Sequence, residues 1–530
     1  MKKYLLLAAA GLALASCAEK GLETKPSNGE LEESYVAISL AAGDMSTKAS
    51  DGKYEEGRSE ERAVKSAYVL FFKDGKPFHV NFDGTTSTNA GPKNYLKVDL
   101  SNADKQDGMD NISDIKNAVL VLQNYKGEYP NQIVALLNWT PTLSEYTLDQ
   151  IRTNTPLPGD DEKGYMMSNS VYKDAAGQIV DATPLTIDHI YKSSGDALKN
   201  PVTINVERVG AKVQLVNEGA ALLFDIDRTV TNVDGTDVKV YAKILDWDLY
   251  NVIDRSYLLK NLSGHANWTG EDFGFTNWND PDWHRSYWAT SLGADKLNKT
   301  FTWEYTTMTP RVYIGENTNA WTEQNDTRTK IIVKAQLVEA DGTTPVEVAN
   351  WYGKDYVTEE VLLGVVASTL NNKYFSSADG QTFTGIEGTD IKCVAREANA
   401  EKAYEVYFQL KEDGKTWYKY ENGSYVSISD SNLNGELANV QPALVYNDGM
   451  TYYYTDIKHL GKEKTTTEYG IVRNHVYNVN ITKIDGFGTP VYDKNIDFVT
   501  PEKPSDIVTY VAAKINILSW RLVEHNYELK

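Results

Sequence analysis

The chain has 530 residues, of which 41% are hydrophobic and 11% aromatic, and a formal net charge of −21. This length and apolar content suffice for two or three domains with buried cores, which excludes a largely disordered chain. The negative charge argues against binding of nucleic acid or of anionic membranes through a basic surface.

The first 17 residues have the features of an export signal. Lys2 and Lys3 precede an apolar run over residues 5–15, which is too short to span a bilayer. The small residues directly before Cys17 resemble the lipobox of bacterial lipoproteins. We therefore expect a lipoprotein signal peptide over 1–17, with acyl chains (palmitate among them) on Cys17. An ordinary secretory signal with an incidental cysteine is the alternative.

The cysteine content excludes an internal disulfide if Cys17 is lipidated, since Cys393 is the only other cysteine. Stability must then come from apolar cores, and Cys393 is expected to be buried as a small apolar residue.

A short strand and a cleavable segment follow the signal. Val36, Ile38 and Leu40 alternate with small or polar residues, which is typical of a strand with one buried face. Residues 43–61 are polar and contain basic residues in small-polar surroundings, as a trypsin-like protease requires. The alternative is a surface loop that is never cut. The candidate cleavage residues are Lys48 and Ala49, with Arg58 and Arg62 as further candidates.

The body of the chain consists of short strand patterns separated by turn residues, with few amphipathic helix patterns. The first series covers 64–72, 95–100, 116–122, 133–138 and 201–215. The second series covers 239–248, 312–314, 331–337, 403–410, 417–426, 450–454 and 472–481, with a strand or short helix at 359–366. This succession predicts an all-β protein built from β-sandwiches.

The last strand pattern follows a Pro-containing spacer over 499–506. Apolar residues alternate with polar ones there, and the phase changes near Leu518, which predicts a β-bulge or a bend. An exposed apolar strand at a chain end invites pairing with another molecule. The apolar residues of this segment are Val511, Ala513, Ile515, Ile517, Leu518 and Trp520.

Catalytic and cofactor motifs are absent from the sequence: it has no zinc-protease, phosphate-loop, dinucleotide-binding or nucleophile-elbow pattern. Asp280, Asp282 and His284 lie close together, but nothing supplies a fourth metal ligand. The Trp-rich stretch 247–303 fits either a sugar-stacking platform or core filling, and we favour core filling. We expect no catalytic residue, no metal and no cofactor.

Several segments together resemble the fimbrillin family of Bacteroidales, the type V pilins, and within it the shaft (stalk) subunits of minor, Mfa-type fimbriae. The resemblance extends over most of the chain and is weakest at 370–460, where the chain has hairpins of its own. The segments that carry it are the lipobox, the strand at 34–40, and residues 206–213, 286–289, 472–479, 484–488 and 515–520.

The resemblance implies two transthyretin-like β-sandwich domains in tandem and a C-terminal donor strand. It also implies that a trypsin-like surface protease removes the N-terminal strand, so that a strand of a neighbouring subunit can take its place. The expected divisions are 1–17 for the signal peptide, 18–48 for the propeptide, 49–220 and 221–498 for the two domains, and 499–530 for spacer and donor strand.

The function expected on these grounds is that of a structural subunit of surface fimbriae, in adhesion, biofilm formation and virulence. Its partners would be copies of itself in a head-to-tail filament, accessory anchor and tip subunits, and the processing protease. The precursor would be anchored in the outer membrane by its lipid. Two alternatives remain: a monomeric surface lipoprotein that binds glycans through 247–303, and, as a more distant one, a glycosidase.

Overall fold

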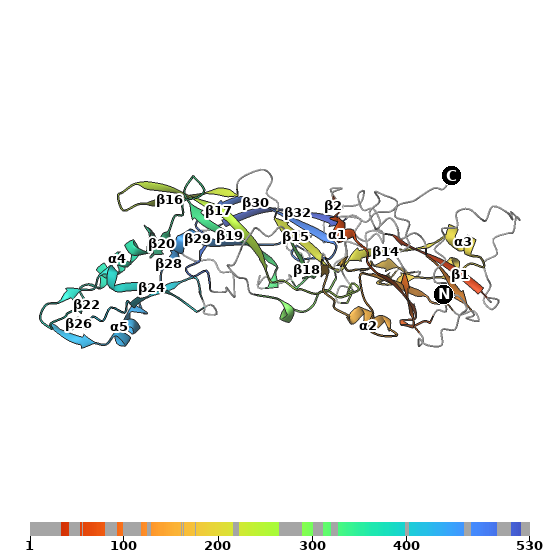
Figure 1. Cartoon of the computed structure of the whole chain (residues 1–530), viewed down its shortest axis with the longest axis horizontal. Coiled ribbons are helices and arrows are strands. Elements are labelled where there is room, and N and C mark those ends of the chain that lie inside the picture. Colours follow the sequence, from red (N-terminus) through yellow and green to blue (C-terminus); the bar gives the residue numbers. More distant parts are fainter. Residues whose placement is uncertain are drawn as a thin grey trace.

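The computed structural model describes residues 33–41, 54–55, 57–79, 93–98, 118–123, 129–215 (except 161, 163, 175 and 177), 222–263, 289–299, 311–319, 327–397, 402–459, 468–495 and 510–520. Strands dominate these ranges, which confirms the predicted all-β class. The molecule is elongated, with the N-terminal sheet at one end, a sandwich of long strands in the middle and a smaller lobe at the other end (Figure 1).

The N-terminal region is built on a nine-stranded sheet whose main path is β4-β3-β7-β10-β14-β1-β6, with β5 beside β3 and β13 beside β7. Alternate residues of β3 enter two different buried clusters, so both faces of the sheet are covered. The elements of this region are β1 (Glu33–Ala41), α1 (Ser59–Arg62), β3 (Ala67–Lys73), β4 (Lys76–Pro77), β5 (Tyr95–Val98), β6 (Ala118–Gln123), β7 (Gln132–Leu137), α2 (Leu148–Thr153), β8 (Gly159–Asp160), β9 (Gly164–Tyr165), β10 (Met167–Asn169), β11 (Tyr172–Lys173), β12 (Ile179–Val180), β13 (Thr183–Pro184), η1 (Ile187–His189), α3 (Ser194–Lys199) and β14 (Val202–Arg208).

The middle region is a two-sheet sandwich. One sheet has the order β18-β15-β30-β32-β2 and the other β16-β17-β19-β29-β31. Their elements are β2 (Tyr54–Glu55), β15 (Ala211–Leu215), β16 (Leu223–Thr231), β17 (Asp237–Tyr250), η4 (Ala294–Lys296), β18 (Val312–Ile314), β19 (Lys330–Val338), β29 (Met450–Asp456), β30 (His475–Asp485), β31 (Thr489–Pro490) and β32 (Tyr510–Trp520).

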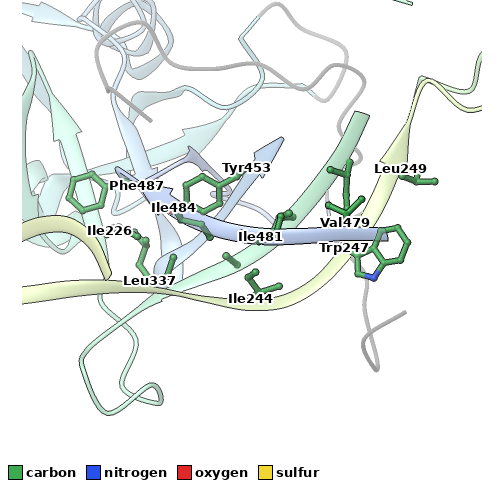
Figure 2. Close-up of a cluster of buried hydrophobic side chains, with 14 of the residues drawn as sticks. Ile226, Ile244, Trp247, Leu249, Leu337, Tyr453, Val479, Ile481, Ile484 and Phe487 are labelled. Atoms are coloured by element: carbon green, nitrogen blue, oxygen red, sulfur yellow. The ribbon is translucent and has the colours of Figure 1, made fainter. Parts of the chain in front are cut away.

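The core of the sandwich fills the space between these sheets. Ile244 and Trp247 of β17 face Val479 and Ile481 of β30, and all four belong to one buried cluster (Figure 2). Burying each such side chain contributes roughly 1.5–3 kcal/mol, before the cost of ordering the chain. The long strands are therefore held mainly by side chains from the two inner faces.

The distal lobe has a third core, and its size was not anticipated from the sequence beyond a set of hairpins. Two helices and several short strands enclose this core, which includes the buried Cys393, as expected. The elements are β20 (Val348–Trp351), β21 (Lys354–Val357), α4 (Glu359–Leu370), β22 (Tyr374–Ser376), β23 (Thr384–Gly385), η6 (Gly388–Asp390), β24 (Ile391–Ala395), β25 (Val406–Leu410), β26 (Trp417–Glu421), β27 (Ser424–Ile428), α5 (Asp430–Leu437), β28 (Leu444–Tyr446) and η7 (Asn447–Gly449).

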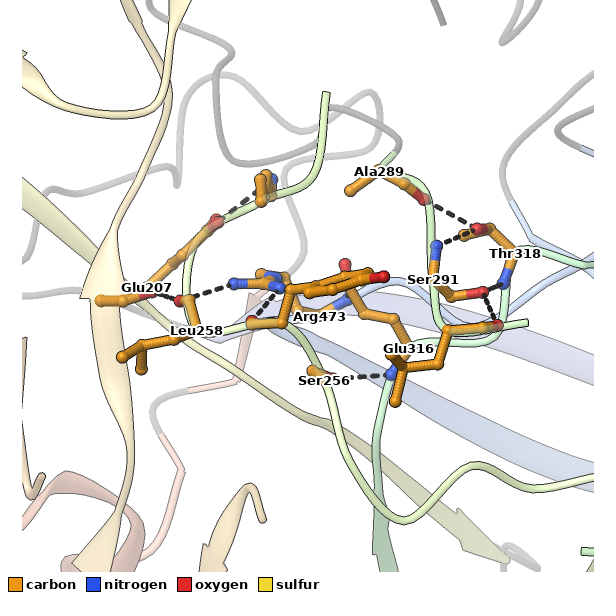
Figure 3. A network of polar contacts seen from close by, with 12 residues as sticks. Glu207, Ser256, Leu258, Ala289, Ser291, Glu316, Thr318 and Arg473 are labelled. Atoms are coloured by element: carbon orange, nitrogen blue, oxygen red, sulfur yellow. Dashed lines mark hydrogen bonds and ion pairs between the residues drawn. The ribbon is translucent and has the colours of Figure 1, made fainter. Parts of the chain in front are cut away.

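Buried charges join the N-terminal sheet to the sandwich. Glu207 at the end of β14 lies 3.2 Å from the Lys260 ammonium, and both side chains are fully buried. Arg473, just before β30, pairs with Glu316 at 2.6 Å and donates a hydrogen bond of the same length to the carbonyl of Tyr257 (Figure 3). Breaking a buried pair of this kind typically costs about 3–5 kcal/mol, so the junction is expected to be stiff.

His475 begins β30 beside this junction. Its Nδ1 lies 2.7 Å from the carbonyl oxygen of Arg473, and its ring packs against that of His459. Burial lowers the pKa of His475 to about 4, and the positive charge of Lys260 adds to the effect. Burial and the neighbouring His475 likewise lower the pKa of His459. Both rings are therefore neutral in the folded protein at neutral pH.

This environment predicts a loss of stability in mild acid. Below a pH of about 6.5 the unfolded chain binds a proton at His475 that the folded chain does not bind until about pH 4. The free energy of unfolding should therefore fall across that window, by roughly 3 kcal/mol in total from His475. We expect the midpoint of thermal unfolding to drop between pH 7 and pH 4.5, and His475→Gln to flatten that dependence. The same substitution at the half-exposed His79 is the control. A His475→Gln variant with an unchanged pH dependence would contradict this account.

Candidate functional site

The predicted N-terminal strand lies inside the sheet. β1 pairs parallel with β14, with Ile38 opposite Val202, and antiparallel with β6, with Val36 opposite Leu120. Val36 and Ile38 are 1% and 2% exposed and belong to the buried cluster of β3, β7 and β14. Leu40 also lies in β1, although its side chain is outside the described part of the structure.

Because β1 lies between β14 and β6, the place that it occupies is a candidate binding site for an extended strand. In the described residues β6 pairs only with β1, and β14 pairs with β1 on one side and β10 on the other. Withdrawal of β1 would leave a row of main-chain groups on β14 and β6 without partners. It would also open the apolar space that Val36 and Ile38 fill. Such a groove accepts an extended segment that restores both the hydrogen bonds and the alternating apolar contacts.

The C-terminal strand is docked on its own chain. β32 pairs antiparallel with β30 from Tyr510 to Ser519, with Ile515 opposite Val479 and Ile517 opposite Tyr477. The predicted bulge near Leu518 is not present, because β32 is continuous there. The irregularity lies in β30 instead, between Ile481 and Lys483.

A two-residue strand closes the outer side of β32. Tyr54 of β2 lies opposite Ser519, and Glu55 lies opposite Trp520, in parallel pairing. β2 follows the predicted cleavage position at Lys48 and precedes Arg58 and Arg62. The cleavable segment and the C-terminal strand are therefore neighbours in the fold, which the sequence did not indicate.

A buried carboxylate fixes the chain directly after β2. Glu61 of α1 is fully buried, and its carboxylate lies 3.1 Å from the ammonium of Lys212, which is 1% exposed. The hydroxyl of Tyr313 also donates to this carboxylate, and Nε of Arg208 donates to the Glu61 carbonyl at 3.0 Å. α1 is thereby tied to β14, β15 and β18.

The candidate cleavage residues differ in their surroundings. Arg58 precedes α1, and its side chain is 34% exposed and pairs with Glu60 at 3.1 Å. Arg62 is the last residue of α1, next to Glu61. Cys17, Lys48 and Ala49 lie outside the described residues. The role of Glu61 could not be predicted from the sequence, because a helix of four residues has no apolar periodicity to reveal which side chain is buried.

The other candidate sites find no support in the described residues. Trp247 is 1% exposed and lies in the sandwich core, as the core-filling interpretation of the Trp-rich stretch predicted for it. Residues 264–288 and 300–303 of that stretch lie outside the described part, and so do Asp280, Asp282 and His284. The residues that the structure describes contain no group of metal-ligating side chains. Within the same ranges, none of the helices has the length and apolar character of a membrane span.

Comparison with known proteins identifies the C-terminal part of the chain. Residues 444–526 match the family model described as "Major fimbrial subunit protein type IV, Fimbrillin, C-terminal". No curated protein matches the chain.

Among solved structures, a fimbrilin (fimA) from Porphyromonas gingivalis is 13% identical, with a TM-score of 0.38 over 93% of this chain and 98% of that one. The tip fimbrial protein Mfa3 from the same species is 12% identical, with a TM-score of 0.31 over 92% of this chain and 100% of that one. These scores are too low to carry the assignment, which rests on the sequence match. The matched residues 444–526, from β28 to beyond β32, are thus similar to the C-terminal part of fimbrillins.

Proposed function

We propose that this chain is a structural subunit of surface fimbriae that polymerises by strand exchange, as a shaft subunit of the Mfa type. It would be exported as a lipoprotein, anchored in the outer membrane by Cys17, and matured by a trypsin-like protease. It would then join copies of itself and accessory anchor and tip subunits in fimbriae that support adhesion. Its role is structural rather than enzymatic.

The observation that carries this proposal is the position of β1 between β14 and β6. An N-terminal strand that lies between β14 and the edge strand β6 and supplies buried side chains blocks the groove that its removal would open. Strand removal by proteolysis is irreversible, whereas simple detachment is not. Cleavage would therefore convert a closed monomer into a subunit with a vacant groove.

The C-terminal strand has suitable dimensions to fill that groove. β32 has 11 residues and β1 has nine, and both alternate apolar with polar or small residues. Each buried aliphatic side chain contributes roughly 1.5–3 kcal/mol, and each ladder bond roughly 0.5–1.5 kcal/mol. In the isolated chain β32 is paired with β30. Exchange would thus trade that ladder for one in the next subunit, and the head-to-tail contact would extend as a filament.

The anchoring of Glu61 favours cleavage after Lys48. A protease needs several residues on each side of the cut in extended form, so susceptibility depends on burial and hydrogen bonding of the backbone. Cutting after Arg58 or Arg62 would require extraction of Glu61 from its contacts with Lys212 and Tyr313. Cleavage after Lys48 leaves those contacts intact.

We expect surface-sheared material to begin at Ala49. Lys48→Ala should leave an uncut precursor, whereas the double variant Arg58→Ala/Arg62→Ala should be cut normally, because the anchored segment is not the substrate. N-terminal sequencing of each product is the measurement. A mature N-terminus at Ser59 or Ala63 would overturn the assignment of the cut, and a start at lipidated Cys17 would overturn proteolytic maturation altogether.

The proposed donor role of β32 depends on the apolar side chains of alternate residues, among them Ile515, which would face the groove. Ile515→Asp places a carboxylate on the apolar phase and should abolish filaments by electron microscopy. Asn516→Asp adds the same charge on the opposite phase and should leave filaments intact. Deletion of residues 510–530 should give a secreted monomer. Filaments built by the Ile515→Asp variant or by the truncated chain would contradict the donor assignment.

Lipidation predicts that the precursor incorporates labelled palmitate through Cys17. Cys17→Ala should abolish labelling and release the precursor from the membrane fraction, while Cys393→Ala, at a buried position, should leave labelling unchanged. Label retained in the Cys17→Ala variant would show that the acyl chain is attached elsewhere.

A further inference from the structure

The distal lobe ends in an open sheet edge. Its sheet has the order β23-β22-β26-β27, and within the described residues β27 pairs only with β26, from Trp417 opposite Ile428 to Glu421 opposite Ser424. The outer side of β27 therefore presents alternating N–H and C=O groups to solvent. These groups are complementary to an extended polypeptide strand and to little else.

Several other edge strands of the sandwich and the lobe are protected against such pairing. β16 has a bulge between Asp225 and Arg228, and β21 begins with Lys354 and Asp355. β18, β23 and β31 have only two or three residues. Charges, bulges and short length are the usual means by which natural sheets avoid pairing between molecules.

β27 has none of these protective features. Its five residues, Ser-Tyr-Val-Ser-Ile, include no charge and no proline. Tyr425 is 40% exposed and Val426 is 47% exposed, although they point to opposite faces of the sheet. The strand thus combines open main-chain groups with accessible apolar side chains on both faces.

An ordered aromatic cluster holds this edge in place. The Tyr425 ring stacks on that of Phe383 with centroids 3.7 Å apart and planes inclined by 5°. Phe375 of β22 packs edge-on against Tyr425 at 5.0 Å, and Tyr420 lies 4.9 Å from it. Because these rings already fix one another, a partner strand would gain a firm surface without the cost of ordering it.

We propose that β27 pairs antiparallel with β27 of a second copy of this chain, about a twofold axis at Val426. In that register Val426 meets its own copy, Tyr425 lies opposite Ser427, and Ser424 lies opposite Ile428. The two sheets become one, and their aromatic faces become continuous.

The absence of charge on β27 favours a second copy over a foreign strand. In self-pairing about a twofold axis, any charged residue at the centre would face its own charge, which destabilises a sheet pair. Lys419 on the neighbouring strand is already neutralised by Glu436 at 2.8 Å. The whole chain carries a net charge of −21, so a foreign partner attracted by charge would be basic. β27 has no acidic residue that could bind such a partner.

A five-residue ladder between two single molecules should be weak. It would be strengthened where many copies are displayed together, because each further contact then forms at a high effective concentration. The lobe lies at the end of the molecule opposite β1 (Figure 1). The contact is therefore independent of strand exchange and would link molecules side by side.

The test uses the uncut full chain carrying Cys17→Ala, which cannot polymerise by strand exchange on the proposal above. Analytical ultracentrifugation should show concentration-dependent dimers. Val426→Lys and Val426→Glu should each weaken dimerisation by roughly fivefold or more, since like charges then meet across the axis. An equimolar mixture of the two variants should restore it, because Lys then faces Glu. Val233→Lys, at an 82% exposed position in the β16–β17 turn, is the matched control.

The mixing experiment separates the possible occupants. No dimers in the parent chain, or dimers unaffected by Val426→Lys, would overturn the proposal. Weakening by each variant without rescue in the mixture would mean that β27 does not meet its own copy, and would also overturn it. An unchanged thermal unfolding midpoint confirms that each variant is folded. Failure of filament assembly would not affect any of these outcomes.

Discussion

The organisation of this protein depends on the hydrogen bonds of two strands that do not pair with each other. β14 and β6 meet only through β1, so their main-chain groups and the apolar space between them are satisfied by residues 33–41. Buried main-chain groups must have partners, and a sheet interrupted in this way is therefore either closed by its own N-terminal strand or open to a substitute. The proposed assembly follows from that requirement.

The same constraint separates the part of the N-terminal segment that can leave from the part that cannot. Glu61 is held by side chains and backbone from β14, β15 and β18, so the chain after residue 57 is integral to the fold. Of the described residues before position 57, those of β1 join the N-terminal sheet and the two residues of β2 join the sandwich sheet beside β32. On the proposed maturation, this buried carboxylate, 20 residues after the end of β1, would mark where the folded subunit begins.

The alternation of apolar and polar residues predicted the positions of strands, because it depends only on the local sequence. The strands at 64–72 and 133–138 and the N-terminal strand at 34–40 were predicted within a few residues, because alternation reports which face is buried. Pairing partners were not predictable in this way: that β1 joins β14 in parallel, or that β2 lies on β32, depends on the whole topology.

The size of the distal lobe was underestimated because α4 has apolar residues on most of its circumference and gives little amphipathic signal. The charged junction of Glu207, Lys260, Glu316 and Arg473 could not be inferred, since these residues are distant in sequence and each would ordinarily be exposed. The domain divisions near 48, 220 and 498 remain predictions.

The direction of the β30–β32 ladder has a mechanical consequence. Both strands run roughly along the long axis of the molecule (Figure 1), and they pair over nearly their full length. In the unpolymerised chain, where β32 is still paired with β30, tension along that axis would load the ladder bonds in shear, so that many must break together, whereas a perpendicular ladder would open one bond at a time. The chain has no disulfide among its described residues to limit extension. Resistance to pulling would therefore reside in the number of simultaneously loaded hydrogen bonds.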